Sequence, residues 1–144
     1  MTDEILLKNT KKIYLIEKDF NLVKLLTEKY KNDKRVVVIS EDILKYPLDK
    51  FENLIIISNL PYNISTKIIL YLFNYKEKIL EMICMLQKEV ALKFNYNLPK
   101  MNKYKFYTKL ASSYKICFNV SSKVFVPKPK VQSSVVKFSF NNKK

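Results

Sequence analysis

The sequence of 144 residues contains no glycine, no histidine and no tryptophan, and it has only two cysteines. The lack of glycine excludes a Gly-rich loop for phosphates or dinucleotides, because such loops need residues without a Cβ atom. The lack of histidine removes the most common catalytic acid–base and the most common metal ligand. Cys84 and Cys117 have no CxxC or Cys/His spacing. Their spacing argues against a zinc site or a disulfide framework and favours a reducing compartment.

Long apolar runs are also missing. None approaches the roughly 20 residues of a membrane-spanning helix, and the Lys-rich start lacks the apolar centre of a signal peptide. Hydrophobic residues make up 48% and charged residues 28% of the chain, which is typical of a soluble globular protein. We therefore expect one domain at residues 1–140 and a polar, basic tail at residues 141–144. The expected protein is monomeric, with no metal and no membrane partner.

Acidic residues are absent from the second part of the chain. From Val90 to Lys144 there are twelve lysines and no acid, and the whole chain has a net charge of +14. This asymmetry favours a polyanionic partner, with RNA or DNA ahead of a membrane. The alternative is a composition bias from AT-rich coding, which explains the many lysines and asparagines but not the loss of acids from one part only.

Hydrophobic periodicity predicts helices and strands that alternate, with strands dominating the end of the chain. The continuous β-branched runs Val36–Ile39 and Leu54–Ile57 are typical of strands buried on both faces. Ser65 is the expected N-cap of a helix that extends to about Asn74. The pattern predicts an α/β domain with a mostly parallel sheet and late antiparallel strands. The remaining expected helices begin near Thr2 and span 19–31, 88–94 and 104–113, and the remaining strands span 13–16, 82–86, 116–120 and 133–140.

Three polar residues follow predicted strands at their carboxyl ends, where ligands bind in parallel α/β sheets. Glu17 ends one strand, Asp42 follows the next, and Asn59 follows the third. A carboxylate at the first position can accept two ribose hydroxyls, and one at the second can accept an adenine amine. For either acid alone, a helix-capping or solvent-facing role is the common alternative, but their joint placement favours contact with a nucleoside-containing cofactor.

The segment Asn59-Leu60-Pro61-Tyr62 has the groups that suit a flipped-out adenine. Pro61 restricts Leu60 and directs the chain out of the sheet with a stiff backbone. Tyr62 offers a ring for stacking, while the Asn59 side-chain oxygen and a main-chain carbonyl can accept both hydrogens of the exocyclic amine. Two such acceptors would favour attack of the amine nitrogen on a methyl group without a base stronger than water. The alternative is an ordinary strand exit with Asn in a turn.

A stiff basic loop precedes the last predicted strand. Lys123, Lys128 and Lys130 are interleaved with Pro127 and Pro129. Phe125 could supply a second stacking surface while the lysines contact phosphates. A Pro-rich connector with a core phenylalanine is the alternative.

Taken in order, these motifs resemble the KsgA/Erm family of ribosomal RNA adenine dimethyltransferases, and the KsgA branch more closely. The resemblance covers essentially the whole chain. It is carried by the runs Tyr14-Leu15-Ile16-Glu17-Lys18-Asp19, Ser40-Glu41-Asp42-Ile43-Leu44, Ser58-Asn59-Leu60-Pro61-Tyr62-Asn63-Ile64-Ser65, Leu86-Gln87-Lys88-Glu89-Val90-Ala91 and Phe125 through Ser133.

The resemblance implies a Rossmann-like class I methyltransferase domain. S-adenosylmethionine would be the methyl donor, and two adjacent adenines near the 3′ end of small-subunit rRNA would be the substrate. Glu17 and Lys18 would bind the cofactor ribose region, Asp42 and Ile43 the cofactor adenine. Asn59, Leu60, Pro61 and Tyr62 would hold the target base, Asn59 also near the cofactor. Phe125 would stack on the other side of that base. Bacterial cytoplasm is the expected location, with an organelle as the alternative.

The chain also departs from the family pattern. It begins after the position of the family's first strand, the central one, and its Gly-rich turn, and no C-terminal helical domain follows Phe140. Glu41 replaces the usual glycine before Asp42, and Lys105 stands where the family often has glycine. We therefore expect a truncated form of the enzyme. The alternatives are a non-catalytic RNA-binding or ribosome-assembly fragment and an inactive gene remnant.

Overall fold

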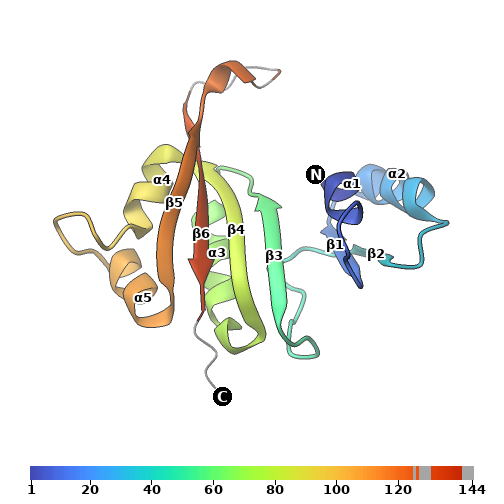
Figure 1. Ribbon diagram of the computed structural model, residues 1–144, viewed down its shortest axis with the longest axis horizontal. Coiled ribbons are helices and arrows are strands. Elements are labelled where there is room, and N and C mark those ends of the chain that lie inside the picture. Colours follow the sequence, from blue (N-terminus) through green and yellow to red (C-terminus); the bar gives the residue numbers. More distant parts are fainter. Residues whose placement is uncertain (125, 127–130, 141–144) are drawn as a thin grey trace. The chain divides into compact units, whose positions relative to one another are not determined.

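The computed structural model describes residues 1–124, 126 and 131–140, and the chain divides into two compact units, Met1–Pro47 and Leu48–Lys144. Each unit has its own β-sheet (Figure 1). Within the described residues, no helix combines the length and the apolar character that crossing a membrane requires.

The first unit contains a parallel two-stranded sheet. Residues Ile13 to Glu17 of one strand pair in register with Val36 to Ser40 of the other. The helix between them begins at an N-cap, Asp19, whose side chain accepts hydrogen bonds from the backbone N–H groups of Asn21 and Leu22, as acidic caps do. The elements of this unit are α1 (Thr2–Leu6), β1 (Ile13–Glu17), α2 (Phe20–Tyr30) and β2 (Val36–Ser40).

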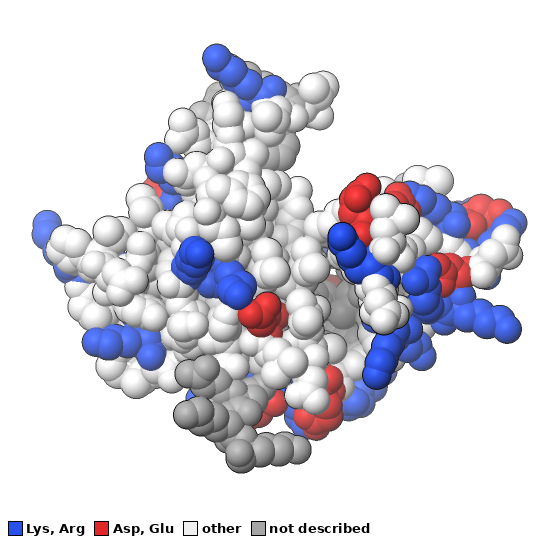
Figure 2. Space-filling view, in the orientation of Figure 1, with Lys and Arg blue, Asp and Glu red and all other residues white. Residues whose placement is uncertain are grey.

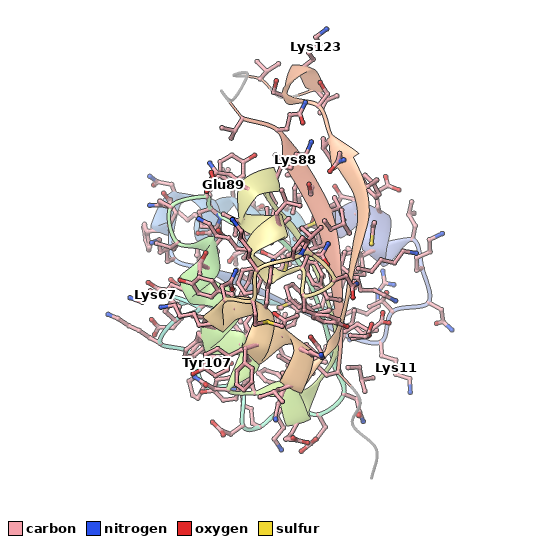
Figure 3. All side chains as sticks on the ribbon, turned by 90° about the vertical axis from the view of Figure 1, so that its left-hand side faces the viewer. Lys11, Lys67, Lys88, Glu89, Tyr107 and Lys123 are labelled. Atoms are coloured by element: carbon pink, nitrogen blue, oxygen red, sulfur yellow. The ribbon has the colours of Figure 1, made fainter. Side chains whose placement is uncertain are left out.

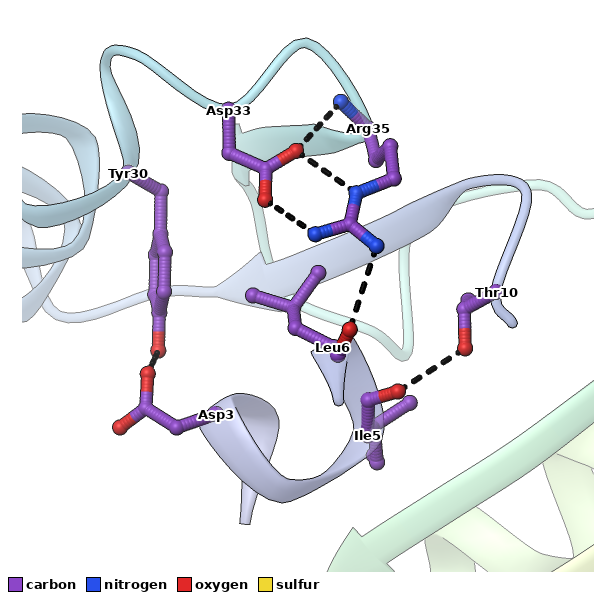
Figure 4. Close-up of polar contacts among 7 residues, drawn as sticks. All are labelled: Asp3, Ile5, Leu6, Thr10, Tyr30, Asp33 and Arg35. Atoms are coloured by element: carbon purple, nitrogen blue, oxygen red, sulfur yellow. Dashed lines mark hydrogen bonds and ion pairs between the residues drawn. The ribbon is translucent and has the colours of Figure 1, made fainter. Parts of the chain in front are cut away.

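Polar contacts hold α1 against the other elements of this unit (Figure 4). The guanidinium of Arg35 donates two hydrogen bonds to the Asp33 carboxylate and one to the carbonyl of Leu6. The hydroxyl of Tyr30 donates to Asp3 over 2.8 Å. Hydrogen bonding to Arg35 lowers the pKa of Asp33, which keeps this carboxylate charged and the contact intact at neutral pH.

The second unit contains a four-stranded mixed sheet in the order β3-β4-β6-β5. β3 and β4 are parallel, and β6 is antiparallel to both of its neighbours, β4 and β5. The elements of this unit are β3 (Leu54–Asn59), α3 (Ser65–Phe73), the 3-10 turn η1 (Lys76–Lys78), β4 (Ile79–Gln87), α4 (Lys88–Phe94), α5 (Lys103–Ala111), β5 (Ser113–Val120), the 3-10 turn η2 (Ser122–Val124) and β6 (Ser133–Ser139).

The core of this unit lies between the sheet and its helices. Met82, Cys84, Leu86 and Val136 are fully buried on one face of β4 and β6. On the same face, the ring of Phe138 packs edge-on against Phe73 of α3 at 5.5 Å and against Phe94 of α4 at 5.8 Å. Burial raises the pKa of the Cys84 thiol to about 12, so this cysteine is a neutral core residue and not a nucleophile.

The predicted order of elements is confirmed, and the helix expected over residues 88–94 has those bounds in α4. Parallel pairs are followed by antiparallel ones, as expected. Among the described strands, none pairs with both β1 and β3, and each of these two lies at an edge of its own sheet.

The expectation that two strands are buried on both faces is wrong. Ile55 and Ile57 of β3 are 60% and 39% exposed, and the residues of β2 are half-buried or exposed. Both strands lie at the edge of a sheet, and in the second unit the helices cover the face opposite Ile55 and Ile57. In this chain, a continuous β-branched run correctly predicts a strand but does not predict that both faces of the strand are buried.

The expected N-cap at Ser65 is also wrong. The N-cap of α3 is Ile64, which makes no side-chain capping bond, and Ser65 is the first residue of the helix. The Ser65 hydroxyl instead donates back to the carbonyl of Tyr62 at 3.3 Å. The Ser65 hydroxyl therefore stabilises the turn that precedes α3 and does not accept a hydrogen bond from the first N–H groups of the helix.

Candidate functional site

The elbow that follows β3, defined as Asn59-Leu60-Pro61-Tyr62, leaves the sheet at its carboxyl end. The Leu60 N–H donates to the carbonyl of Met85 on β4, and the Leu60 side chain is buried. The Pro61 carbonyl accepts from the N–H of Ile64. One hydrogen bond thus joins the elbow to the neighbouring strand and another to the turn before α3, so its backbone is held on both sides.

Asn59 is exposed, as is Pro61, the other exposed residue of the elbow. It is the last residue of β3 and lies opposite Met85, so it is on the sheet face that α3 and α4 leave uncovered. Among the described residues, its side-chain amide has no hydrogen-bond partner. The amide can therefore accept from, or donate to, a ligand without first losing an internal bond.

Tyr62 is half-buried, and its hydroxyl lies 2.6 Å from the hydroxyl of Ser133. Ser133 is the first residue of β6 and is completely buried. The side chain of Tyr62 therefore reaches from the elbow across the end of β4 to the next strand. The stacking residue expected from the sequence is fixed at its hydroxyl end.

Lysines lie at the same end of the sheet. The Lys88 N–H donates to the Gln132 carbonyl, and its ammonium lies 3.2 Å from the Gln132 side-chain oxygen. Lys123 lies farther out, near the tip of the connection between β5 and β6, as Figure 3 shows. Lys88 and Lys123 are therefore exposed cations at the end of the sheet where the elbow lies.

The acids expected to bind the cofactor lie together in the first unit. Glu17 ends β1 opposite Ser40 of β2, and the Glu17 carbonyl accepts from the N–H of Glu41. One carboxylate oxygen of Glu17 accepts from the N–H groups of Lys18 and Asp19. This arrangement places Glu17 within two residues of Asp42 across the sheet edge, as the parallel-strand rule predicts.

Asp42 uses its carboxylate in a similar way. Its Oδ1 accepts from the N–H of Leu44, which shapes the turn after β2, and Asp42 and Ile43 are both half-buried. In Glu17 and in Asp42, one carboxylate oxygen is used within the chain and the other has no partner among the described residues. Both side chains therefore keep an acceptor for donors from outside the protein. Lys18, beside them, is exposed.

The structure thus gathers the sequence-predicted residues into two groups, one in each unit. Glu17, Lys18, Asp42 and Ile43 form the first group. The elbow forms the second, to which the structure adds Ser133, Gln132 and Lys88. Phe125, Lys128 and Lys130 lie outside the described residues, as do residues 141–144.

Sequence reasoning missed the contact between Ser133 and Tyr62 and that between Lys88 and Gln132. All four residues lie within motifs that carry the family resemblance, but no local pattern indicates that they meet. Tyr62 and Ser133 are 71 positions apart in the chain, and Lys88 and Gln132 are 44 positions apart. Only the register of β6 against β4, with Ser133 opposite Gln87, brings them together.

Charge is sparse on the open face of the four-stranded sheet. Figure 2 shows that this face is mostly uncharged, with a few basic groups and an acidic group near its middle. On β4, the Glu81 carboxylate forms an ion pair with the Lys137 ammonium of β6 at 2.9 Å. Among the described residues, no group of three or more Asp, Glu, Cys or His side chains could hold a metal ion.

The fold is that of the class I methyltransferases. The structure is similar to the 23S rRNA methyltransferase ErmE, with a TM-score of 0.81 at 22% identity over 90% of this chain and 52% of that one. It is also similar to a dimethyladenosine transferase from Plasmodium falciparum, with a TM-score of 0.78 at 26% identity over 91% of this chain and 48% of that one.

The sequence comparison gives the family. The family model described as "Ribosomal RNA adenine dimethylase" matches residues 1–144, so the chain belongs to this family. It is 36% identical over 140 residues to the ribosomal RNA small subunit methyltransferase A of Malacoplasma penetrans, covering 94% of this chain and 50% of that protein. The protein of the same description from Clostridium botulinum is 35% identical, with 92% of this chain and 50% of that protein covered. The chain spans about half the length of the curated relatives it matches.

Proposed function

We propose that this chain is the catalytic part of a ribosomal RNA adenine N6-dimethyltransferase. Its substrate is a pair of adjacent adenines near the 3′ end of small-subunit rRNA, and S-adenosylmethionine is its methyl donor. The observation that carries the proposal is the elbow after β3. An exposed Asn59 amide and a Tyr62 ring held by its hydroxyl lie at one strand end, in a chain of the adenine dimethylase family.

The elbow supports recognition of a base that has left its stack. Tyr62 provides a face on which an unstacked purine stacks. The Asn59 side-chain oxygen accepts one hydrogen of the adenine amine. The carbonyls of Pro61 and Tyr62 already accept hydrogen bonds within the turn, but the turn provides no donor to the Leu60 carbonyl. The Leu60 carbonyl is therefore the proposed acceptor for the second hydrogen of the adenine amine.

These two acceptors explain how an amine of low nucleophilicity reacts. They draw the amine hydrogens toward oxygen, which disfavours delocalisation of the nitrogen lone pair into the ring. They also stabilise the positive charge that develops on the nitrogen as it accepts the methyl group. The proton that the nitrogen then loses can go to water, so no histidine is needed.

The first unit supports binding of the cofactor. S-adenosylmethionine supplies an electrophilic methyl group when bound. Glu17 and Lys18 would hold its ribose region, the Glu17 carboxylate as acceptor for hydroxyls. Asp42 and Ile43 would hold its adenine, the Asp42 carboxylate as acceptor for the amine. Half-buried carboxylates at neighbouring strand ends fit these donors.

The acid-free part of the chain contacts the RNA. Lys123 lies in η2, in the connection between β5 and β6, and Lys128 and Lys130 follow it in sequence. These lysines bind phosphates, and Phe125 stacks on the target base from the side opposite Tyr62. The curated relatives come from bacteria, and we place the reaction in the bacterial cytoplasm, on the immature small ribosomal subunit.

Transfer of a labelled methyl group tests the proposal. The chain is incubated with small subunits that lack the two methylated adenines, and label in the RNA is measured for the unaltered chain and for Asn59→Ala. We expect transfer by the unaltered chain. Loss of one oxyanion-hole-type contact costs about 100-fold or more in turnover. We expect a fall of that size in Asn59→Ala with little change in RNA affinity, because Asn59 acts on the reacting amine.

RNA binding without transfer by the unaltered chain would contradict the catalytic proposal and favour an RNA-binding or assembly role. Equal turnover in Asn59→Ala would remove Asn59 from the mechanism. Asn63→Ala provides a matched control, because Asn63 is an exposed asparagine in the turn just beyond the elbow.

A further inference from the structure

We propose that Ser133 is a positioning residue that fixes the ring of Tyr62 before a base arrives. The inference rests on the proposed function, because it assigns the ring of Tyr62 to stacking on a substrate purine. It adds a residue of the last strand to the site and gives the Tyr62 hydroxyl a structural task.

Ser133 is well suited to hold another side chain. It is completely buried, and it begins β6, an inner strand of the sheet. In the two ladders of this strand it lies opposite Gln87 of β4 and Val120 of β5. Because strands flank it on both sides, its hydroxyl has a fixed position at the carboxyl end of β4.

Tyr62 is held at both of its ends. At the hydroxyl end, its Oη lies 2.6 Å from Ser133 Oγ. At the backbone end, its carbonyl accepts from the Ser65 hydroxyl, and the nearby Leu60 N–H donates to Met85. The half-buried ring between these ends has little freedom to rotate away. A ring that is already ordered costs less entropy when a base stacks on it.

The contact also limits what the Tyr62 hydroxyl can do. Its hydrogen-bonding partner is a buried serine of the protein itself. The ring face is then the part of Tyr62 that the substrate uses. Tyr62→Phe and Ser133→Ala remove the same hydrogen bond from its two sides, so they are expected to have the same effect.

Ser134, the next residue of β6, provides the matched control. It is buried to the same degree, and its hydroxyl donates to the Asn119 side chain at 2.7 Å. Ser134→Ala removes one hydroxyl and one hydrogen bond of similar length from the same strand, but it does not touch Tyr62. A general loss of packing or stability in β6 would affect both serine variants alike.

The test uses the full chain and a short single-stranded RNA that contains one 2-aminopurine, whose fluorescence falls when it stacks on an aromatic ring. The quenching and the dissociation constant are measured for the unaltered chain, Tyr62→Ala, Tyr62→Phe, Ser133→Ala, Ser134→Ala and the double variant of Tyr62→Phe with Ser133→Ala. Thermal unfolding of each variant is followed in parallel.

We expect Tyr62→Ala to reduce quenching strongly, because it removes one of the two rings proposed to stack on the base. Ser133→Ala and Tyr62→Phe should each raise the dissociation constant for the probe about fivefold, the effect of losing one neutral hydrogen bond. The double variant should bind the probe no more weakly than either single variant, because both substitutions remove the same bond. Ser134→Ala should bind the probe like the unaltered chain even if its unfolding temperature falls. If Ser133→Ala does not fold, Tyr62→Phe removes the same bond without altering the buried position.

Two results would overturn the inference. Equal quenching and binding in Ser133→Ala, Tyr62→Phe and the unaltered chain would show that the contact does not position the ring, and would leave the proposed function standing. Effects that add in the double variant would mean that the two residues act separately. Absence of quenching by the unaltered chain would instead contradict the proposed function, and the inference with it.

Discussion

Lys105 is a lysine on α5 that is 5% exposed and lies inside the second unit. Its ammonium donates hydrogen bonds to the carbonyls of Leu98, Pro99 and Lys100 over 2.7 to 3.1 Å. Three carbonyls can satisfy the three donors of an ammonium, which explains why burial of this charge is tolerated. The side chain therefore organises the loop before α5, in which Lys100 has a positive φ of 59°.

We expect Lys105→Met to lower the free energy of unfolding by about 2–3 kcal/mol. Methionine keeps most of the side-chain volume but leaves the three carbonyls without their charged donor. Urea unfolding followed by circular dichroism measures the change. Lys109→Met, at an exposed position of the same helix, should change the free energy by less than about 0.5 kcal/mol. Equal effects of the two substitutions would contradict the structural role of Lys105.

At the scale of elements, β4 and β6 are joined by an ion pair as well as by their backbones. Glu81 of β4 accepts from the Lys137 ammonium of β6, and the two side chains are each 36% exposed. The hydrogen bond from Lys137 is the main reason that the pKa of Glu81 is lowered from its ordinary value of 4.5. A carboxyl whose pKa is lower in the folded state stabilises that state above its unfolded pKa.

The pair should therefore contribute to stability at neutral pH, and this contribution should be lost as the pH falls below 4.5 and through the lowered value in the folded chain. We expect Glu81→Gln to unfold at lower urea concentration than the unaltered chain at pH 7, and the difference to shrink in acid. Glu89→Gln, which alters an exposed pair within α4, controls for the loss of one acid. A difference between Glu81→Gln and the unaltered chain that persists unchanged in acid would contradict this role.

At the scale of the whole molecule, the charge distribution bears on the proposed RNA binding. All acids precede Val90, and the lysines that follow are uncompensated in sequence. Binding of such a chain to RNA releases counterions, so its affinity should fall steeply as salt is raised. Figure 3 places Lys123 at the outer end of the sheet that the elbow also occupies, and Tyr107 of α5 toward the other end.

We expect Lys123→Ala to reduce the slope of log affinity against log salt by about 1, because one phosphate contact is lost. Fluorescence anisotropy with a short single-stranded RNA over a salt series measures the slope. Lys109→Ala, on the same helix as Tyr107, removes the same charge at a distance from the elbow and should leave the slope unchanged. Equal slopes for Lys123→Ala and the unaltered chain would place the RNA elsewhere.

Local patterns were sufficient for the order and approximate bounds of the elements. The helix from Lys88 to Phe94 and the strands near Ile13, Val36 and Ser133 follow from periodicity, because side chains three to four apart share a helix face and alternate ones share a strand face. The meeting of Glu17 with the Asp42 turn also followed from sequence, since the carboxyl ends of adjacent parallel strands share an edge.

Other features depended on contacts between distant residues. The apolar run of β3 does not reveal that Ile55 and Ile57 are exposed, because burial depends on which elements cover a strand. Nor does the lysine at position 105 reveal that its ammonium is enclosed by carbonyls of the preceding loop. The bond of Tyr62 to Ser133 joins residues 71 positions apart, and it exists because β6 runs antiparallel beside β4 in one particular register. Periodicity is a property of neighbours in the chain, whereas register and coverage are decided when distant segments pack.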